Sequence, residues 1–327
     1  MSCLRDPLRW SELFNFPQWQ DFKASLQQDL QAFPPEYALV IAPLLTAGGQ
    51  RIRPLLCFLC AQACGLEQSK KEKLVFLAKA GEYLHLASLL HDDVMDQGCL
   101  RRNLPCAHRI WGNRRAILAG DFLLSQGLKA LIAIHHSPIL SLFQKTMSAM
   151  TLGQMKEENI QWTSSIKNYL QVCRYKTAAL FSTLCHSAGC LTDEYPATLH
   201  NLHHFGHFLG MAFQIMDDCW DVSPPKDWGK KPFQDFYDQK ITFPTLMAWQ
   251  RSSSADQIAL EHLFKAPCAN GQEALMQILK KYNAIHDSLE SAKRYGQKAF
   301  SCLTSLSPSK AVGNLKEITR LLLQYDY

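Results

Sequence analysis

Helical periodicity runs through almost the whole 327-residue chain, and this feature restricts the possible folds most. Apolar residues recur about every three to four positions, as they do on one face of a helix, and no run alternates like a strand. We expect long helices over about residues 18–32, 36–46, 70–96, 114–135, 138–160, 165–190 and 196–221, one beginning at Pro54, and shorter ones toward the C-terminus. No linker or repeat divides the chain, so residues 1–327 are predicted to form one all-α domain.

One interruption of this pattern is long for a compact domain. The stretch "VSPPKDWGKKPFQDFYDQKITF", residues 222–243, contains proline, glycine and charged residues without a helical period. Loops of this length usually carry function.

Composition and charge exclude several classes of protein. The hydrophobic fraction of 47% supports a large core, and the net charge of +5 is spread without the basic block of a nucleic-acid arm. Twelve cysteines without an amino-terminal apolar signal segment predict reduced thiols and a cytoplasmic protein. The most apolar stretch, residues 116–134, contains Asp121 and Lys129, so we predict no integral membrane segment.

Three aspartates end an apolar helix in "LLHDDVMDQGCLRR". Asp92 and Asp96 are four residues apart and share one helical face, with Asp93 beside them. Like charges this close raise each other's pKa unless a cation neutralises them. A solvated acidic helix end is the alternative interpretation, but the apolar residues before Asp92 place the cluster at the edge of a core.

A second cluster repeats the pattern. "FQIMDDCWD" contributes Asp217, Asp218 and Asp221, again after an apolar helix. Two such clusters predict a shared site between two helices, and carboxylate ligands with room for water and phosphate oxygens favour Mg²⁺.

Basic residues near these clusters suit the anionic ligand that such a metal often accompanies. Each is, taken alone, more often a solvated surface charge, but a guanidinium or ammonium beside an acidic cluster can hold phosphate oxygens. The candidates are Arg51, Arg53, Arg101, Arg102, Lys176, Lys230, Lys231 and Lys240.

Together these motifs resemble the trans (E-type) polyprenyl diphosphate synthases. Seven motifs occur in the family's order between Gly48 and Pro244: "GGQRIRP", "DDVMDQGCLRR", "GDFLL", Gly153-Gln154, Lys176-Thr177, "FQIMDDCWD" and "GKKPFQDFYDQKITFP". The resemblance implies the isoprenoid synthase helical bundle around a deep central cavity, and the pattern is most similar to octaprenyl-type long-chain synthases.

The resemblance also implies roles for individual residues. Mg²⁺ would be held by Asp92, Asp96, Asp217 and Asp221, and catalysis would depend on Asp92, Asp96, Lys176, Asp217 and Lys240. The allylic diphosphate would contact Arg101, Lys176, Thr177, Gln214, Lys240 and Lys230 or Lys231; isopentenyl diphosphate would contact Gln50, Arg53, His85 and Arg102. The implied partners are these two diphosphates and a second copy in a homodimer, with no nucleic acid and at most transient membrane contact during product release.

The implied reaction is ionisation of the allylic C–O bond, attack of the isopentenyl double bond on the cation, and loss of a proton. This chemistry needs stabilisation of the leaving group and a water-free surround. Three departures from the family pattern concern substrate binding: Gln50 replaces a lysine, and Phe233 and Gln239 replace glycines of the long loop.

Product length should depend on residues that precede Asp92. Ala87 and Ser88 lie about 6–8 Å below it at 1.5 Å per residue, and both are small, so Leu84 and Tyr83 are the next candidates for a floor. By resemblance the product is long, about C30–C50 and centred near C40.

Alternative functions remain open. A geranylgeranyl or farnesyl diphosphate synthase would share the motifs, and Gln50 keeps open a catalytically weak subunit of a heteromeric synthase. A terpene cyclase would lack the paired arginines, and a di-iron bundle would need two ExxH motifs, of which only Glu82 to His85 is present. Cys57, Cys60 and Cys64 suggest core packing rather than zinc binding.

Overall fold

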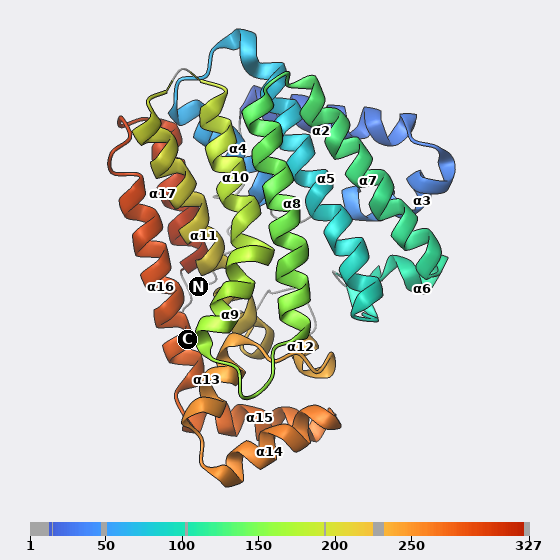
Figure 1. Cartoon of the computed structure of the whole chain (residues 1–327), viewed down its shortest axis with the longest axis vertical. Coiled ribbons are helices and arrows are strands. Elements are labelled where there is room, and N and C mark those ends of the chain that lie inside the picture. Colours follow the sequence, from blue (N-terminus) through green and yellow to red (C-terminus); the bar gives the residue numbers. More distant parts are fainter. Residues whose placement is uncertain are drawn as a thin grey trace.

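The computed structural model describes residues 13–14, 16–46, 51–101, 104–192, 194–224 and 232–323. Over these ranges the chain is almost entirely helical, which confirms the predicted all-α class (Figure 1). The first elements are α2 (Pro17–Ala32), α3 (Pro35–Thr46), α4 (Ile52–Ala63), the 3₁₀ turn η2 (Gln68–Lys70), α5 (Lys71–Met95), β1 (Leu100–Arg101), β2 (Leu104–Pro105), α6 (Ala107–Trp111), α7 (Asn113–Ala133) and α8 (Ser137–Glu158). They are followed by α9 (Ile166–Val172), the π-helical turn η3 (Cys173–Ala178), α10 (Ala179–Cys190), α11 (Pro196–Val222), α12 (Gln234–Tyr237), α13 (Phe243–Arg251), α14 (Ser254–Lys265), α15 (Ala269–Lys281), α16 (Ala284–Cys302) and α17 (Lys310–Leu323).

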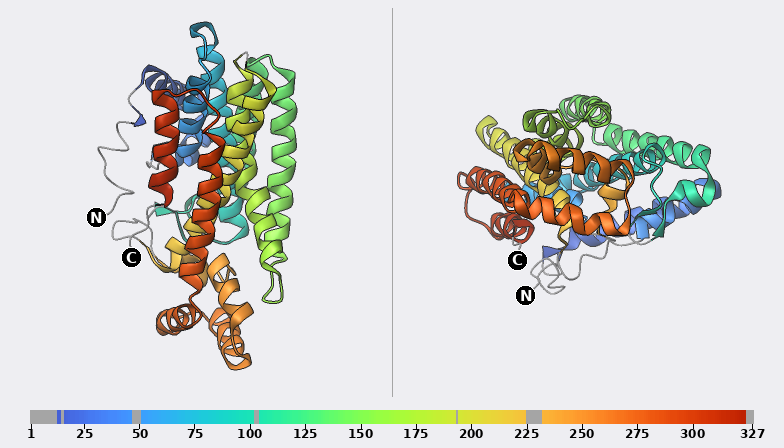
Figure 2. Two further views of the ribbon diagram at one scale, coloured as in Figure 1. Left: turned by 90° about the vertical axis from the view of Figure 1, so that its left-hand side faces the viewer. Right: turned by 90° about the horizontal axis from the view of Figure 1, so that it is seen from below.

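The long helices stand side by side, and α13, α14 and α15 lie across one end of them (Figures 1 and 2). Within the bundle α5 packs along α7, α10 along α11, and α11 along α16. The two short strands pair antiparallel as a hairpin after α5.

The buried apolar residues form two clusters, and α11 contributes to both. Its first half supplies Phe205 and Leu209 to the cluster of the long helices, and its second half supplies Ile215 and Trp220 to the cluster beneath α13 to α16. The second aspartate cluster lies on that second half. It is therefore held by the second core.

Helix α4 begins earlier than predicted. Pro54 was expected at its first position, but α4 starts at Ile52, with Arg51 as its N-terminal cap in the left-handed region (φ 39°). Proline is tolerated throughout a first helical turn because those N–H groups have no intrahelical acceptor. Cys57 and Cys60 are fully buried on this helix, which confirms core packing.

The helix predicted over 165–190 changes its geometry in the middle. Residues Cys173–Ala178 form a π-helical turn between α9 and α10. Such turns are rare and occur frequently at functional sites.

Candidate active site

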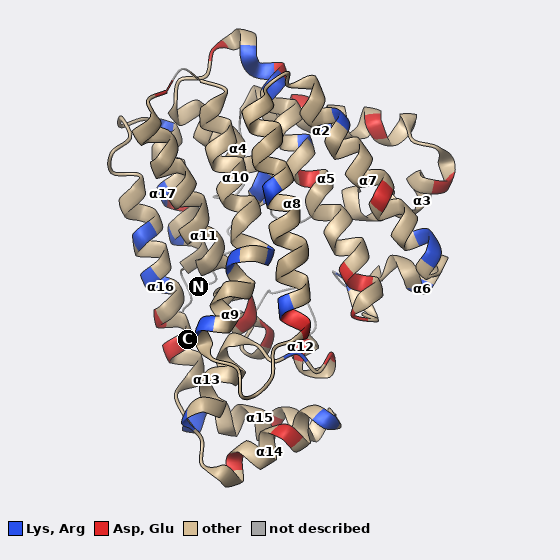
Figure 3. Ribbon diagram, in the orientation of Figure 1, with Lys and Arg blue, Asp and Glu red and all other residues tan. Residues whose placement is uncertain are grey.

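Charged residues of both signs meet around α12 and the adjacent ends of α8 and α9 (Figure 3). The first aspartate cluster reaches this region from the C-terminal end of α5. Asp92 and Asp96 are half-buried there. Asp93, expected beside them, turns its carboxylate to the guanidinium of Arg101, and the residue is only 4% exposed.

The Asp93 to Arg101 contact is bidentate. Arg101 donates from Nε and Nη2 to the Asp93 carboxylate over 2.6–2.9 Å. Burial would lower the pKa of Arg101, but this pairing raises it overall. Arg101 was predicted to contact the allylic diphosphate; here its geometry ties the strand after α5 back to the helix end.

Two lysines from distant segments neutralise the remaining aspartates. The Nζ atom of Lys176 lies 3.5 Å from Asp92 Oδ2, and that of Lys240 lies 2.5 Å from Asp96 Oδ2. Burial raises the pKa of Asp92, as do Glu157 and Asp96, while Lys176 and Lys240 lower it. The site thus holds two ammonium groups against two carboxylates.

Glu157 is a site residue that the sequence reasoning missed. It lies on α8, and its carboxylate accepts a hydrogen bond of 2.5 Å from Lys176. The signal was its position one helical turn after Gly153-Gln154, which places it on the same face as the glycine.

Gly153 explains how Lys176 is positioned. A Cβ atom at residue 153 would lie 2.6 Å from the backbone nitrogen of Lys176, so only glycine lets α8 approach the π-helical turn this closely. On the other side of the turn, a Cβ at Gly210 of α11 would lie 2.6 Å from Ala178 Cα. The turn is therefore clamped between two helices at their smallest residues.

A chain of hydrogen bonds runs from Thr177 to Gln214 and Asp218 of α11. Thr177 Oγ1 donates to Gln214 Oε1 (2.6 Å), and Gln214 Nε2 donates to Asp218 Oδ1 (2.9 Å). The Tyr169 hydroxyl and the backbone N–H of Phe243 also donate to Asp218. Burial raises the pKa of Asp218 to about 8 despite these donors. Asp218 thus orients the site from within the core, whereas Asp217 is half-buried beside it.

Asp221 contacts the segment that crosses from the second cluster to the first. Its carboxylate accepts the backbone N–H groups of Gln234 (2.9 Å) and Asp235 (3.2 Å), which are the first residues of α12. A carboxylate is favourable at a helix N-terminus because those N–H groups lack partners. Burial, together with Asp235, raises the pKa of Asp221 to about 8. Lys240 lies just beyond α12 and completes the link to Asp96.

Two residues of this crossing segment adopt left-handed backbone conformations. They are Phe233 (φ 61°) and Gln239 (φ 57°), the same two positions at which the resembled family carries glycine. A left-handed backbone is less favourable for these two residues than it would be for glycine.

A third group lies between α4, α5 and α10. Arg53 Nη1 is 3.1 Å from His85 Nε2, and the Arg53 guanidinium lies 4.8 Å from the centre of the Phe181 ring. Arg51 instead pairs with Glu82 (2.7 Å). Four predicted substrate residues, Gln50, Arg102, Lys230 and Lys231, lie outside the described residues.

The predicted chain-length residues do not share one face of α5. Ser88 is half-buried, one turn from Asp92, whereas Ala87 and Leu84 are buried, Leu84 against Gly127 of α7. Tyr83 lies nine residues from Asp92, about half a turn away in angle, and its hydroxyl donates to Asp29 of α2. Tyr83 therefore points away from the side of Asp92, which makes it an unsuitable floor.

The donor set fits a hard divalent cation in its chemistry. Asp92, Asp96, Asp217 and Asp221 are all half-buried and offer only oxygen ligands, the type that Mg²⁺ prefers. Within the described ranges, no three acidic, histidine or cysteine side chains already converge on one point. The carboxylates are instead spread over two helices, α5 and α11, and these four residues would hold the cation.

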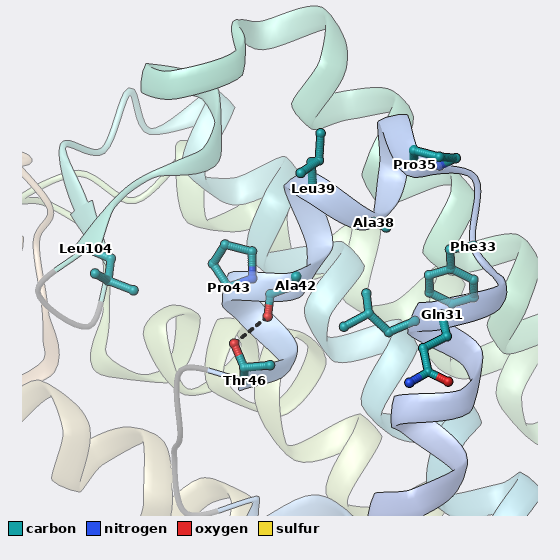
Figure 4. A pocket seen from close by; sticks show the side chains of 10 residues that line it. Gln31, Phe33, Pro35, Ala38, Leu39, Ala42, Pro43, Thr46 and Leu104 are labelled. Atoms are coloured by element: carbon teal, nitrogen blue, oxygen red, sulfur yellow. Dashed lines mark hydrogen bonds between the residues drawn. The ribbon is translucent and has the colours of Figure 1, made fainter.

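An apolar groove lies elsewhere, between α2 and α3 (Figure 4). It has a volume of about 720 Å³ and includes Phe33, Ala38, Leu39 and Leu104. None of the predicted site residues lines it, so it is separate from the acidic clusters.

Known proteins resemble this chain over most of its length. The sequence profile of the polyprenyl synthetase family matches residues 34–282. A prenyl transferase of Porphyra purpurea is 31% identical over 283 residues (86% of this chain, 87% of the relative). Component 2 of a heptaprenyl diphosphate synthase from Geobacillus stearothermophilus is 30% identical (87% and 88%), as is an octaprenyl diphosphate synthase of Haemophilus influenzae (87% of each chain).

Solved structures have the same fold. A geranylgeranyl pyrophosphate synthetase from Pyrococcus horikoshii superposes with a TM-score of 0.89 at 26% identity, covering 98% of this chain and 99% of its own. A polyprenyl synthase from Caulobacter crescentus, complexed with calcium and isoprenyl diphosphate, gives a TM-score of 0.84 at 25% identity (93% and 97%).

Proposed function

We propose that this chain, a prenyltransferase of the polyprenyl synthetase family, condenses isopentenyl diphosphate with an allylic diphosphate to give a long-chain polyprenyl diphosphate. The product is proposed as about C30–C50, near C40, by resemblance to long-chain synthases. The observation that supports this most is the pairing of Lys176 with Asp92 and of Lys240 with Asp96, because it brings motifs from three distant segments to one place.

In this proposal the chain's own groups stabilise the leaving diphosphate. Lys176 and Lys240 supply positive charge, and Thr177 and Gln214 supply further polar contacts at the allylic diphosphate. As the C–O bond breaks, its electron pair stays on the diphosphate, and the isopentenyl double bond attacks the allylic cation to form the new C–C bond. A proton is then lost to the departing diphosphate. Mg²⁺ held by Asp92, Asp96, Asp217 and Asp221 would supply additional charge neutralisation at the leaving group.

Arg53 and His85 are proposed to bind the diphosphate of isopentenyl diphosphate, together with Gln50 and Arg102, and Arg101 and Lys230 or Lys231 to bind the allylic diphosphate. The side chains of Arg53 and His85 already lie within hydrogen-bond distance of each other. Guanidinium donors suit phosphate oxygens in direction as well as charge.

Incubation of the purified protein with MgCl₂, labelled isopentenyl diphosphate and farnesyl diphosphate tests this function. We expect incorporation of label into a product whose length is then measured by chromatography. Absence of incorporation with any allylic primer would refute the proposal. A product of C15 or C20 would instead support the farnesyl or geranylgeranyl alternative. Replacing Asp92 or Asp217 by alanine should abolish turnover while the far-ultraviolet circular dichroism stays unchanged.

We also propose that the protein acts as a cytoplasmic homodimer. Apolar side chains remain exposed on α7 and α8, namely Ile117, Leu118, Leu128, Ile132, Leu152 and Met155. By length and composition alone α7 could cross a membrane, but Asp121 and Lys129 interrupt its apolar face. A protein surface is therefore the better cover for these residues.

Light scattering tests the assembly. The wild type is expected at twice the monomer mass, and Leu128→Glu at the monomer mass. Because a relative is named as one component of a synthase, co-expression with candidate subunits is informative if the wild type is monomeric and inactive.

A further inference from the structure

A buried ion pair lies beside the proposed isopentenyl diphosphate residues. Glu82 of α5 is 5% exposed, and its carboxylate oxygen is 2.7 Å from Nη1 of Arg51. Burying a charged pair has a desolvation cost that its attraction often does not exceed. The pair therefore suggests a role beyond stability.

Arg51 stands at a demanding point of the backbone. It caps the N-terminus of α4 in the left-handed region, which is unfavourable for a residue other than glycine. Its guanidinium contacts both Glu82 and the carbonyl oxygen of Leu45, at the end of α3. Glu82 thereby fixes the point at which the chain enters α4.

One turn of α5 contacts both arginines at the start of α4. Glu82 and His85 are three residues apart and so lie on one helical face. Glu82 pairs with Arg51, and His85 contacts Arg53, two residues further along. The position of Arg53 over the Phe181 ring depends on where α4 begins.

We propose that Glu82 is a positioning residue for the second substrate: by holding Arg51, it orients Arg53 and His85 toward the diphosphate of isopentenyl diphosphate. This rests on the proposed function. It also assigns Arg51 a different role from the predicted anion clamp, since its charge is used within the protein. Arg51 then acts as a strut between α3, α4 and α5.

Steady-state kinetics of Glu82→Gln tests the proposal. We expect the KM for isopentenyl diphosphate to rise by ~10-fold, while kcat and the KM for farnesyl diphosphate stay within about twofold. Arg51→Gln should give the same rise, and the double variant should add nothing, because both changes remove one interaction. Glu72→Gln, on the exposed first turn of the same helix, is the matched control.

Glu82→Asp keeps the charge on a shorter side chain and serves if Glu82→Gln does not fold. It should raise the same KM by a smaller factor. An unchanged KM for isopentenyl diphosphate would overturn the positioning role. So would an equal impairment of kcat and of both KM values together with a lower Tm. An inactive wild type would instead refute the proposed function.

Discussion

The ammonium group of Lys240 lies 2.5 Å from the carboxylate of Asp96, although 144 residues separate them in the chain. Lys240 follows α12, whose first N–H groups bind Asp221. The short segment that contains α12 is thus anchored at its first end by the second aspartate cluster. Its other end contacts the first aspartate cluster. Any ligand that draws on both clusters also affects this segment.

Replacing Lys240 by alanine should lower kcat by about 10²–10³-fold. The physical reason is the loss of a preorganised positive charge where negative charge develops on the leaving diphosphate. The measurement is initial rate under saturating substrates. Lys265→Ala removes a lysine that is largely exposed, and it should leave the rate unchanged. Normal kcat in Lys240→Ala would show that the lysine only closes the loop.

Ser88→Phe should shorten the product. Ser88 is half-buried one turn before Asp92, so a ring there would obstruct a chain that grows along this side of α5. Chromatography of the products measures the effect. Tyr83→Phe is the matched control, because Tyr83 points to Asp29 on the other side of the helix; it should keep the length and lower only the Tm. If Ser88→Phe and the wild type give products of equal length, the product chain does not grow along this side of α5.

Gln239→Gly should raise the Tm by about 1–2 °C. Gln239 is exposed and left-handed, so glycine relieves about 1–2 kcal/mol of backbone strain without loss of packing, and the greater freedom of the unfolded chain offsets about half of this. Differential scanning calorimetry measures the shift. Gln239→Ala keeps the strain and should not raise the Tm; a gain in both variants would contradict the backbone explanation.

Stability should fall in mild acid, and His207 should account for part of the fall. Burial, followed by the nearby Arg174, His203 and His204, lowers the pKa of His207 from 6.5 to about 4. As the pH falls from about 6.5 to 4, the unfolded chain binds a proton that the folded chain does not, so the free energy of unfolding decreases. His207→Gln should therefore lose less Tm between pH 7 and pH 5 than the wild type.

His262→Gln is the control for this measurement, since His262 lies exposed on α14. It should retain the wild-type difference between the two pH values. If His207→Gln retains that difference as well, the acid sensitivity has another source.

Much of the fold followed from periodicity and from glycine and proline positions. The long helices begin and end within about two residues of expectation, because apolar spacing and helix-stopping residues act locally. The π-helical turn could not be predicted, since one additional residue per turn barely disturbs an apolar pattern. The start of α4 was missed by two residues; its N-terminal cap, Arg51, pairs with Glu82, 31 positions later, and a local sequence pattern does not reveal such a contact.

The candidate site was predicted in its residue types but not in its internal contacts. Adjacent aspartates point about 100° apart on a helix, so Asp93 and Asp218 turn to Arg101 and Tyr169 while their neighbours stay half-buried. Which of two adjacent acids turns inward depends on partners from other helices. Glu157 was missed for the same reason, because its significance lies in its contact with Lys176.

The π-helical turn between α9 and α10 determines how α10 is rotated about the helix axis relative to α9. Each residue advances an α-helix by about 100°, and the wider π turn uses one additional residue to turn through the same angle. Winding all six residues of Cys173–Ala178 as a regular α-helix would therefore rotate α10 relative to α9 by about 100°. Tyr169 would keep its place beside Asp218, but Phe181 would no longer lie beneath Arg53. The turn thus sets the rotation of the helix so that Tyr169 faces Asp218 at one end while Phe181 lies beneath Arg53 at the other.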